Sequence, residues 1–239
     1  MLKFKLVTWD CKTRVGCTNE TDWRIGQRVE ATGDPNQGLC SNGWLHCHDT
    51  PELAVMLNPI HANIQNPRMM VVKVEGEGRI DKGLKSGYRV MTPVLFMDCP
   101  EITTVQHVRF AILCALEVWQ AKNFVSWAKN WLTGKDRSNA TATAVGICNA
   151  EAANAAAYAA HAAVYAANDA AIANAVAICN AEAANAAAYA AYAAAYAAND
   201  AAIANANAAV NATYAVYWAA YDATCDLDFV GLAQQAIDE

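Results

Sequence analysis

One segment occurs twice in succession in the C-terminal part of this chain. VGICNAEAANAAAYAAHAAVYAANDAAIANA, at positions 145–175, recurs as VAICNAEAANAAAYAAYAAAYAANDAAIANA at positions 176–206. The copies differ at Gly146/Ala177, His161/Tyr192 and Val164/Ala195. Alanine has the highest intrinsic helix propensity. Since more than half of the positions from Ala140 to Ala223 are alanine, we expect this part of the chain to be helical.

Two arrangements of the repeat are open. The step from Val145 to Val176 turns a straight helix by about 220° at about 100° per residue, so the polar stripes of successive copies would face different sides of one rod. Asn149 and Asp169, with their equivalents Asn180 and Asp200, could cap shorter helices. A unit of this length is close to the size of a solenoid repeat. The pattern therefore favours a compact stack of helices, with one long helix as the alternative.

Tyrosine and polar residues gather on one side of the expected repeat helices, and the other side is almost all alanine. This stripe is either the seam along which the helices pack or an exposed recognition face. Tyrosine is large and amphipathic and is enriched at protein interfaces. We take five tyrosines as candidate partner-binding residues, in contact with another protein or with a second copy of the chain: Tyr158, Tyr165, Tyr189, Tyr192 and Tyr196.

Basic residues end at Arg137. The chain up to Arg137 carries all 17 basic side chains and 14 of the 23 acidic ones, and the rest carries the other nine acidic side chains. Binding to a nucleic acid depends on cations that displace phosphate counterions, so the C-terminal part lacks what it needs. The first part is close to neutral and has no basic stripe. We therefore expect no nucleic-acid partner.

The cellular compartment is inferred from three features. The N-terminus, MLKFKLVTWDCKTR, lacks the uncharged core of a signal peptide. The alanine segments 152–168 and 183–199 are too weakly apolar to span a membrane, and Asn and His interrupt them. Without an export signal, the nine cysteines are expected to be reduced thiols. The expected location is the cytoplasm, with no membrane partner.

The N-terminal part of the chain, positions 1–100, predicts a small α+β domain. Leu2–Trp9 alternates apolar residues with Lys3 and Lys5, as in a strand with one polar face. Met69–Glu75 and Gly87–Asp98 are two further predicted strands, rich in Val, Met, Leu and Phe.

Two helical segments are predicted outside the repeat. Asp49 or Thr50 can cap a helix that starts at Pro51 and ends near Asn58-Pro59. Residues 101–137 form an amphipathic connection, either one helix or a broken pair, with a capping box from Thr103 to Gln106 and a stop at Gly134. The predicted fold class is therefore α+β, with an α+β domain (1–100), connecting helices (101–137) and an Ala-rich helical repeat domain (138–239).

Motifs for catalysis are absent from the sequence. There is no GxGxxG, Walker loop, GxSxG or HExxH. The cysteines and histidines between Cys11 and His61 lack zinc-ribbon spacing, so free thiols are favoured over a metal site. A Cys/His nucleophilic pair has no local support. We expect no metal, no cofactor and no catalytic residue, and the sequence leans against an enzyme without excluding one.

Two adjacent stretches, GWLHCH and LNPIHANIQNPR, hold the densest set of polar and aromatic residues. Loop residues of these types often contact ligands, whereas the alternative is that they only terminate elements and fill the core. The candidate ligand-binding residues are Trp44, His46, His48, His61, Asn63 and Arg68.

The chain resembles a set of uncharacterised tailed-bacteriophage proteins. The resemblance rests on GWLHCHDTPELAVMLNPIHANIQNPR (positions 43–68), VEGEG and GLKSGY (74–88), and RFAILCALEVW with WAKNWLTGKDRS (109–138), followed by an Ala-rich tail. Positions 110–163 are also loosely similar to alanine-rich immunity proteins. The resemblance implies a virus-encoded protein in the cytoplasm of a bacterial host and carries no catalytic residues.

Three functions are open. The first is a non-enzymatic phage accessory protein that binds a host or phage macromolecule, with a host defence component as one such target. The second is an N-terminal domain that binds or processes a nucleotide-like small molecule through His46, His48, His61 and Arg68. The third is a structural role, in which the alanine faces assemble into oligomers.

Overall fold

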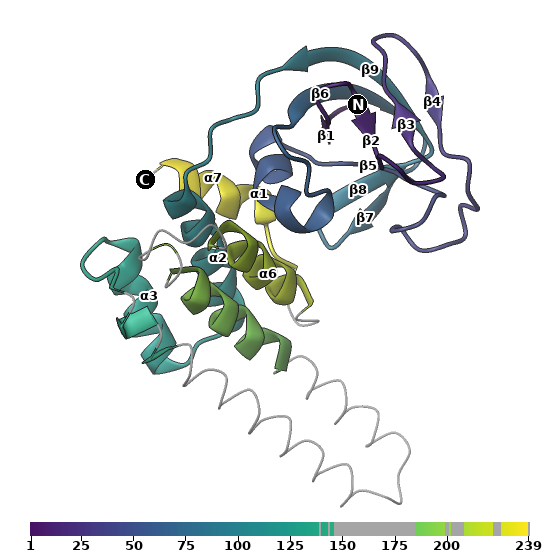
Figure 1. Ribbon diagram of the computed structural model, residues 1–239. Helices are drawn as coiled ribbons and strands as arrows, with labels where there is room; N and C mark the ends of the chain where they lie inside the picture. The colour runs from purple at the N-terminus through teal and green to yellow at the C-terminus, as the bar shows by residue number, and fades with distance from the viewer. Residues whose placement is uncertain are drawn as a thin grey trace, which may run out of the picture. The chain divides into compact units, whose positions relative to one another are not determined.

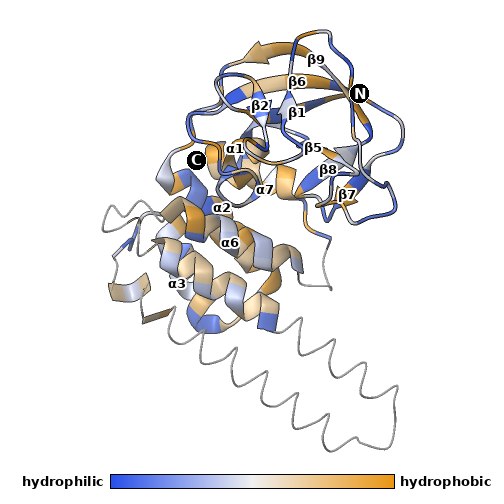
Figure 2. Ribbon diagram, turned by 45° about the vertical axis from the view of Figure 1, so that its right-hand side comes forward, coloured by the Kyte–Doolittle hydropathy of each residue, from blue (hydrophilic) through white to orange (hydrophobic). Residues whose placement is uncertain are grey.

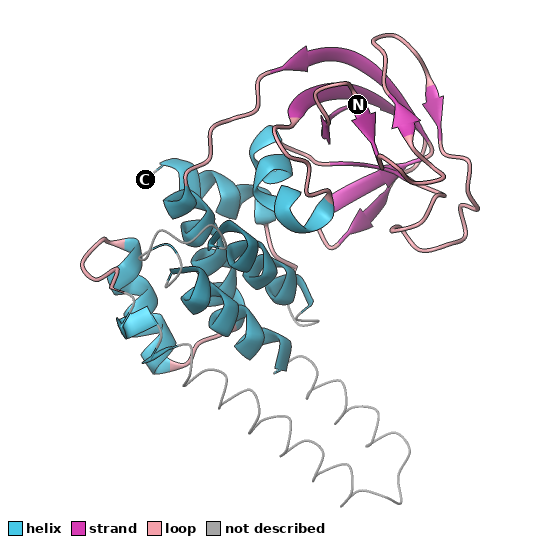
Figure 3. Ribbon diagram, viewed as in Figure 1, coloured by secondary structure: helices cyan, strands magenta, loops and turns pink. Residues whose placement is uncertain are grey.

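A computed structural model describes residues 1–138, 140–142, 144–145, 185–198, 201, 208–221 and 226–238. It contains helices and antiparallel sheets, which confirms the α+β class. The chain divides into two compact units, one of Met1–Ile102 with Asp228–Gln234 and one of Thr103–Leu227 with Gln235–Glu239. The strands that the structure describes all lie in the first unit (Figures 1 and 3). The first copy of the repeat after Val145, including Tyr158 and Tyr165, lies outside the described residues.

The first unit is built from three antiparallel sheets. The largest has the strand order β1-β6-β9-β4, and its members are β1 (Leu2–Val7), β6 (Arg68–Glu75), β9 (Val90–Met97) and β4 (Val29–Glu30). The second has the order β5-β8-β7, with β5 (Leu45–Cys47), β8 (Lys85–Tyr88) and β7 (Arg79–Asp81). The third is a ribbon of β2 (Lys12–Thr13) and β3 (Thr21–Asp22). The three long strands predicted from the sequence are confirmed, the last of them divided into β8 and β9.

The core of this unit is shared among the sheets. Met70, Val72 and Val74 of β6 pack with Leu45 and Cys47 of β5 in one buried cluster. Neighbouring Met69 of β6 points to a second cluster with Ala54 of helix α1 (Pro51–His61). Both faces of β6 are therefore covered, which explains the continuous apolar run of this strand, largely orange in Figure 2.

The predicted polar face of β1 is wrong. Lys3 and Lys5 are buried, at 9% and 8% exposure. Lys3 forms an ion pair of 2.6 Å with Asp49, and Lys5 donates to the carbonyl oxygen of His46 at 2.7 Å. The alternation of β1 predicts one exposed face, but the Trp23 ring lies against Lys5, whose Nζ is 4.9 Å from the ring centroid.

Helix α1 begins as predicted and ends later. Thr50 is its N-cap and accepts a hydrogen bond from the backbone of Leu53. The helix continues through Pro59 to His61, so the predicted end near Asn58-Pro59 is wrong. The reason is local. The Asn58 side chain donates to the carbonyl oxygen of Ile64 at 3.0 Å and accepts from its N–H at 3.1 Å, which stabilises one further turn.

The second unit is helical in its described part. The predicted connection is a broken pair, α2 (Thr104–Val118) and α3 (Lys122–Leu132), and the Thr103–Gln106 capping box is confirmed. Trp119 leaves the helical conformation between them. Helix α6 (Ala208–Tyr221) packs on α2. Helix α7 (Phe229–Asp238) is divided between the two units. None of the described helices is long and apolar enough to cross a membrane.

Candidate functional site

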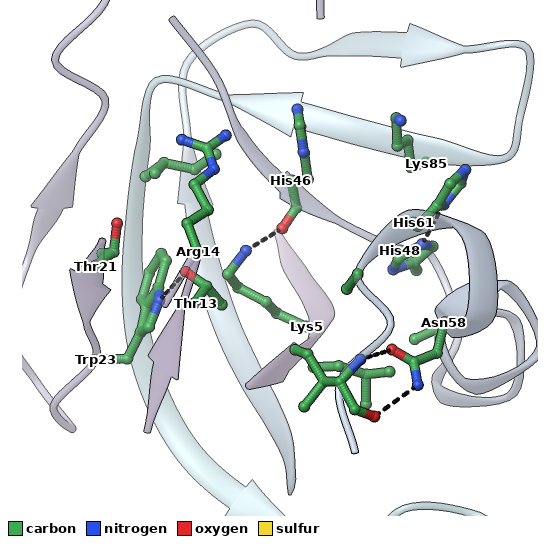
Figure 4. Close-up of a pocket in the computed structure, with 15 residues that line it drawn as sticks. Lys5, Thr13, Arg14, Thr21, Trp23, His46, His48, Asn58, His61 and Lys85 are labelled. Atoms are coloured by element: carbon green, nitrogen blue, oxygen red, sulfur yellow. Dashed lines mark hydrogen bonds between the residues drawn. The ribbon is translucent and has the colours of Figure 1, made fainter. Parts of the chain in front are cut away.

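The first unit contains a cavity of about 190 Å³. Its walls come from β1, the β2–β3 ribbon, β5 and α1 (Figure 4). Its polar lining comprises Lys5, Thr13, Arg14, Thr21, Trp23, His46, His48, Asn58, His61 and Lys85. Three of the six candidate ligand-binding residues, the histidines, thus converge on one space.

The histidines reach the cavity from two elements. His46 and His48 lie two residues apart at β5, so both point to one side, and Cys47 between them points into the core. His61 is the last residue of α1. The Nε2 atom of His48 lies 3.4 Å from Nδ1 of His61, and the two rings stack with centroids 5.7 Å apart.

Burial keeps these imidazoles neutral. It lowers the pKa of His46 to about 4 and that of His61 to about 3, and it lowers the pKa of His48 well below its ordinary value. The Nε2 atom of His46 lies 2.6 Å from the carbonyl oxygen of Leu39. A carbonyl only accepts, so this nitrogen carries the proton. The buried Nδ1 of His48 has no hydrogen-bond partner in the part of the chain that the structure describes.

Three cationic side chains complete the cavity. Lys5 lies with its Nζ 4.9 Å from the centroid of the Trp23 ring, and burial lowers its pKa to about 8. Arg14 donates to the carbonyl oxygens of Ser41 and Trp44 at 3.3 and 3.2 Å. Lys85 lies 3.5 Å from Asp81 and 3.2 Å from the thiol of Cys40.

Acidic side chains are missing from this lining: no Asp or Glu is among the described residues that form the walls. The neutral histidines offer N–H donors and ring nitrogens, and the cations supply positive charge. The arrangement therefore suits a small ligand that carries a negative charge.

The other three candidate residues lie elsewhere. The buried Trp44 donates its indole N–H to the carbonyl oxygen of Gln37 at 3.3 Å. Asn63 is exposed in the turn after α1, with φ of 47°. Arg68 stacks between the rings of Trp9 and Phe96, at 4.9 and 4.3 Å from their centroids. The predicted grouping of Arg68 with the histidines is wrong, because β6 carries its side chain to a separate hollow.

The cysteines that the structure describes are free thiols: Cys11, Cys17, Cys40, Cys47, Cys99 and Cys114. Burial raises the pKa of Cys47 to about 12, so this thiol is a poor nucleophile. Among the described residues, no group of three His, Cys, Asp or Glu side chains could hold a metal ion.

The cationic residues of the cavity were not among the candidates from the sequence. Lys5 sits in a strand whose alternation predicts an exposed lysine. Arg14 adopts φ of 56° in the loop after β2, and no motif marks it. Lys85 follows a glycine turn that predicts only a connection between strands. These three side chains meet in one cavity because distant strands pair, and a pattern of neighbouring residues cannot predict that pairing.

A second cluster of side chains lies in the helical unit. Residues 185–198 are helical, and Tyr189 lies 5.6 Å from Trp218 of α6, centroid to centroid. The rings of Tyr192 and Tyr196 are tilted by 41° to each other, with centroids 4.5 Å apart. These aromatic residues form a hollow of about 290 Å³ together with Ala193, Asn211 and Tyr214. Three of the five predicted partner-binding tyrosines are thus brought together.

Comparison of the chain with known protein families, curated proteins and solved structures finds no match.

Proposed function

We propose that the first unit binds a small anionic molecule in the histidine-lined cavity. One observation carries this proposal: Lys5, Arg14 and Lys85 line one cavity together with three neutral histidines, and no carboxylate is among its described walls. Buried cations usually pair with acids, because an unpaired charge loses its hydration. Lys5 and Arg14 have no carboxylate partner among the described residues, and the Asp81 partner of Lys85 lies outside the cavity lining, so an anion from solution would pair with these side chains.

The proposal is one of binding. The three imidazoles are neutral at pH 7, so they act as hydrogen-bond donors and acceptors toward the ligand. A cavity of about 190 Å³ lies below the usual range for drug-sized ligands, about 300–1,000 Å³. The ligand is therefore a small molecule, or the charged end of a larger nucleotide-like one.

Replacing Arg14 with Gln is expected to weaken phosphate binding by at least about tenfold, because a charge-assisted hydrogen bond contributes about 1.5–3 kcal/mol. The measurement is isothermal titration calorimetry of inorganic phosphate into the purified full chain. Arg24→Gln is the matched control. Arg24 is exposed, pairs with Asp22 at 3.0 Å and does not line the cavity.

Equal phosphate affinity in wild type and Arg14→Gln would contradict the proposal, as would no phosphate binding by the wild type. Arg14 also holds two backbone carbonyls, so a thermal melt of each unliganded variant is needed to separate lost binding from lost folding.

A second function is proposed for the aromatic hollow: it binds a protein partner in a bacterial host, as a phage accessory protein would, with a host defence component as one such partner. The support is Tyr214, which lines the hollow and is 47% exposed. Stacking of the two copies of the repeat, or pairing with a second copy of the chain, would extend this tyrosine surface.

Tyr214→Ser is expected to lose a partner that wild type retains in affinity purification from phage-infected cells. Truncating an interface tyrosine often reduces the binding free energy by more than about 1 kcal/mol. Ile25→Ser is the control, since Ile25 is also about half exposed and lies in the first unit. Equal recovery of every protein by the two variants would contradict this function. Light scattering of the purified chain measures self-association directly.

A further inference from the structure

Lys5 differs from the other lysines of the first unit in its surroundings. Lys3 and Lys12 each contact a carboxylate, Asp49 at 2.6 Å and Glu20 at 2.7 Å. Lys5 has one hydrogen bond, to the carbonyl oxygen of His46, and no carboxylate within ion-pair distance among the described residues. It is 8% exposed and still contributes to the cavity wall.

This setting enlarges the neutral fraction of the Lys5 amine, although most of it stays protonated at pH 7. The charged form of Lys5 has lost its water shell, while its gains are a single backbone carbonyl and the face of Trp23. Figure 4 shows its Nζ directed toward the strand that carries His46. The neutral form of a lysine that lines a cavity is a nucleophile for carbonyl compounds.

We infer that Lys5 binds its ligand covalently, as an imine with a small aldehyde or ketone that also bears an anionic group, such as a 2-oxo acid. This inference rests on the proposed anion binding. The anionic group would lie against Arg14 or Lys85, which share the cavity with Lys5.

The step balances without a redox partner. The lone pair of the neutral Lys5 nitrogen attacks the carbonyl carbon, and the C=O π bond opens. The oxygen takes up a proton, the nitrogen loses one, and the carbinolamine then expels water to leave a C=N bond. The proton that the nitrogen loses balances the proton that the oxygen takes up, so the step consumes no external acid or base.

The test treats the purified full chain with pyruvate and sodium cyanoborohydride at pH 7, followed by peptide mapping by mass spectrometry. Hydride from the reductant converts the imine to a stable secondary amine that carries a carboxyethyl group. With a pKa of about 8 against 10.5 for an ordinary lysine, the neutral fraction of Lys5 is about 300-fold larger at pH 7. Since the cavity restricts access, we expect Lys5 to be labelled at least about tenfold faster than any other described lysine.

Two controls sharpen the result. Lys5→Arg keeps the positive charge and cannot form the imine, so the selective adduct must vanish. Lys3→Arg changes a buried lysine of the same strand and should retain the label at Lys5. Methyl pyruvate, the uncharged ester, should label Lys5 at least about tenfold more slowly than pyruvate.

The outcomes separate this inference from the proposed function. Phosphate binding by the wild type with no selective label on Lys5 overturns the imine and leaves anion binding in place. Equal labelling by pyruvate and its ester overturns recognition of the anionic group. Selective labelling without phosphate binding overturns the proposed anion site. Mapping of the wild type needs no variant, so the test survives if Lys5→Arg fails to fold.

Discussion

Lowering the pH from 7 to 5 is expected to reduce the free energy of unfolding of the first unit by about 4 kcal/mol. Burial lowers the pKa of His46 to about 4 and that of His61 to about 3. Between these values and the unfolded pKa of about 6.5, the unfolded chain binds protons that the folded chain does not. Stability therefore falls as the pH falls through this window, by about 2 kcal/mol for each histidine at pH 5.

Other groups do not obscure this effect. His48 adds to it in the same direction, because burial also lowers its pKa. Lys5, with a pKa of about 8, stays protonated in both states between pH 5 and pH 7, so its contribution is constant. The exposed carboxylates of Asp10 and Glu20 have lowered pKa values, and the stability they supply is lost mainly at lower pH.

The measurement is urea unfolding of wild type and His61→Gln at several values between pH 5 and pH 7. The variant should show a pH slope smaller by about one proton, because one buried imidazole is gone. Parallel slopes in wild type and variant would mean that His61 is not held neutral by the fold. If the free energy of unfolding of the wild type did not change between pH 5 and pH 7, the prediction of neutral buried histidines would be wrong.

Arg89→Met is expected to lower the free energy of unfolding by about 3 kcal/mol. The Arg89 guanidinium donates to three backbone carbonyls, those of Gly33 (2.7 Å), Gly43 (2.6 Å) and Ala31 (2.9 Å). Hydrogen bonds from a charged donor contribute about 1.5–3 kcal/mol each, less where water can replace the donor. Methionine fills similar space and offers no N–H.

The matched control is Arg28→Met, whose guanidinium is exposed and pairs with Glu30 at 2.9 Å. Exposed ion pairs contribute about 0–1 kcal/mol, so urea unfolding of this variant should resemble wild type. An equal loss of unfolding free energy in both variants would show that the three carbonyl contacts of Arg89 are not the cause of its effect. Arg89 also holds both ends of the loop from Gly33 to Gly43. This loop carries Leu39, whose carbonyl oxygen accepts the hydrogen bond from His46. Phosphate binding by Arg89→Met should therefore weaken along with its stability.

The sequence predicted those helices and strands whose caps or apolar runs are formed by residues close together in the chain. The Thr103–Gln106 box, the Thr50 cap and the apolar runs of β6 and β9 depend on residues close together in the chain. The short strands between β1 and β5, such as β2 and β3, were missed. Each of them is only a pair of residues, too few for a period to show.

The candidate site was predictable only in part. His46, His48 and His61 lie in one dense stretch of sequence, because α1 begins shortly after β5 and carries His61 at its end. Lys5 comes from a strand far away in the sequence, and its contacts with His46 and Trp23 join segments that are distant along the chain. The same long-range pairing moved Arg68 away from the histidines. Periodicity within β1 could reveal neither outcome.

The pairing of β1 with β6 also sets the order in which the site can form. Leu2 pairs with Lys73, across most of the chain of this unit. Closing so long a loop lowers the chain entropy before the stabilising contacts form. Folds that depend on such long-range pairs therefore fold slowly. The cavity also needs Lys5 of β1 beside His46 of β5, a second contact between segments far apart in the sequence. An anion that fits the cavity should therefore slow the unfolding of this unit and leave its refolding rate unchanged.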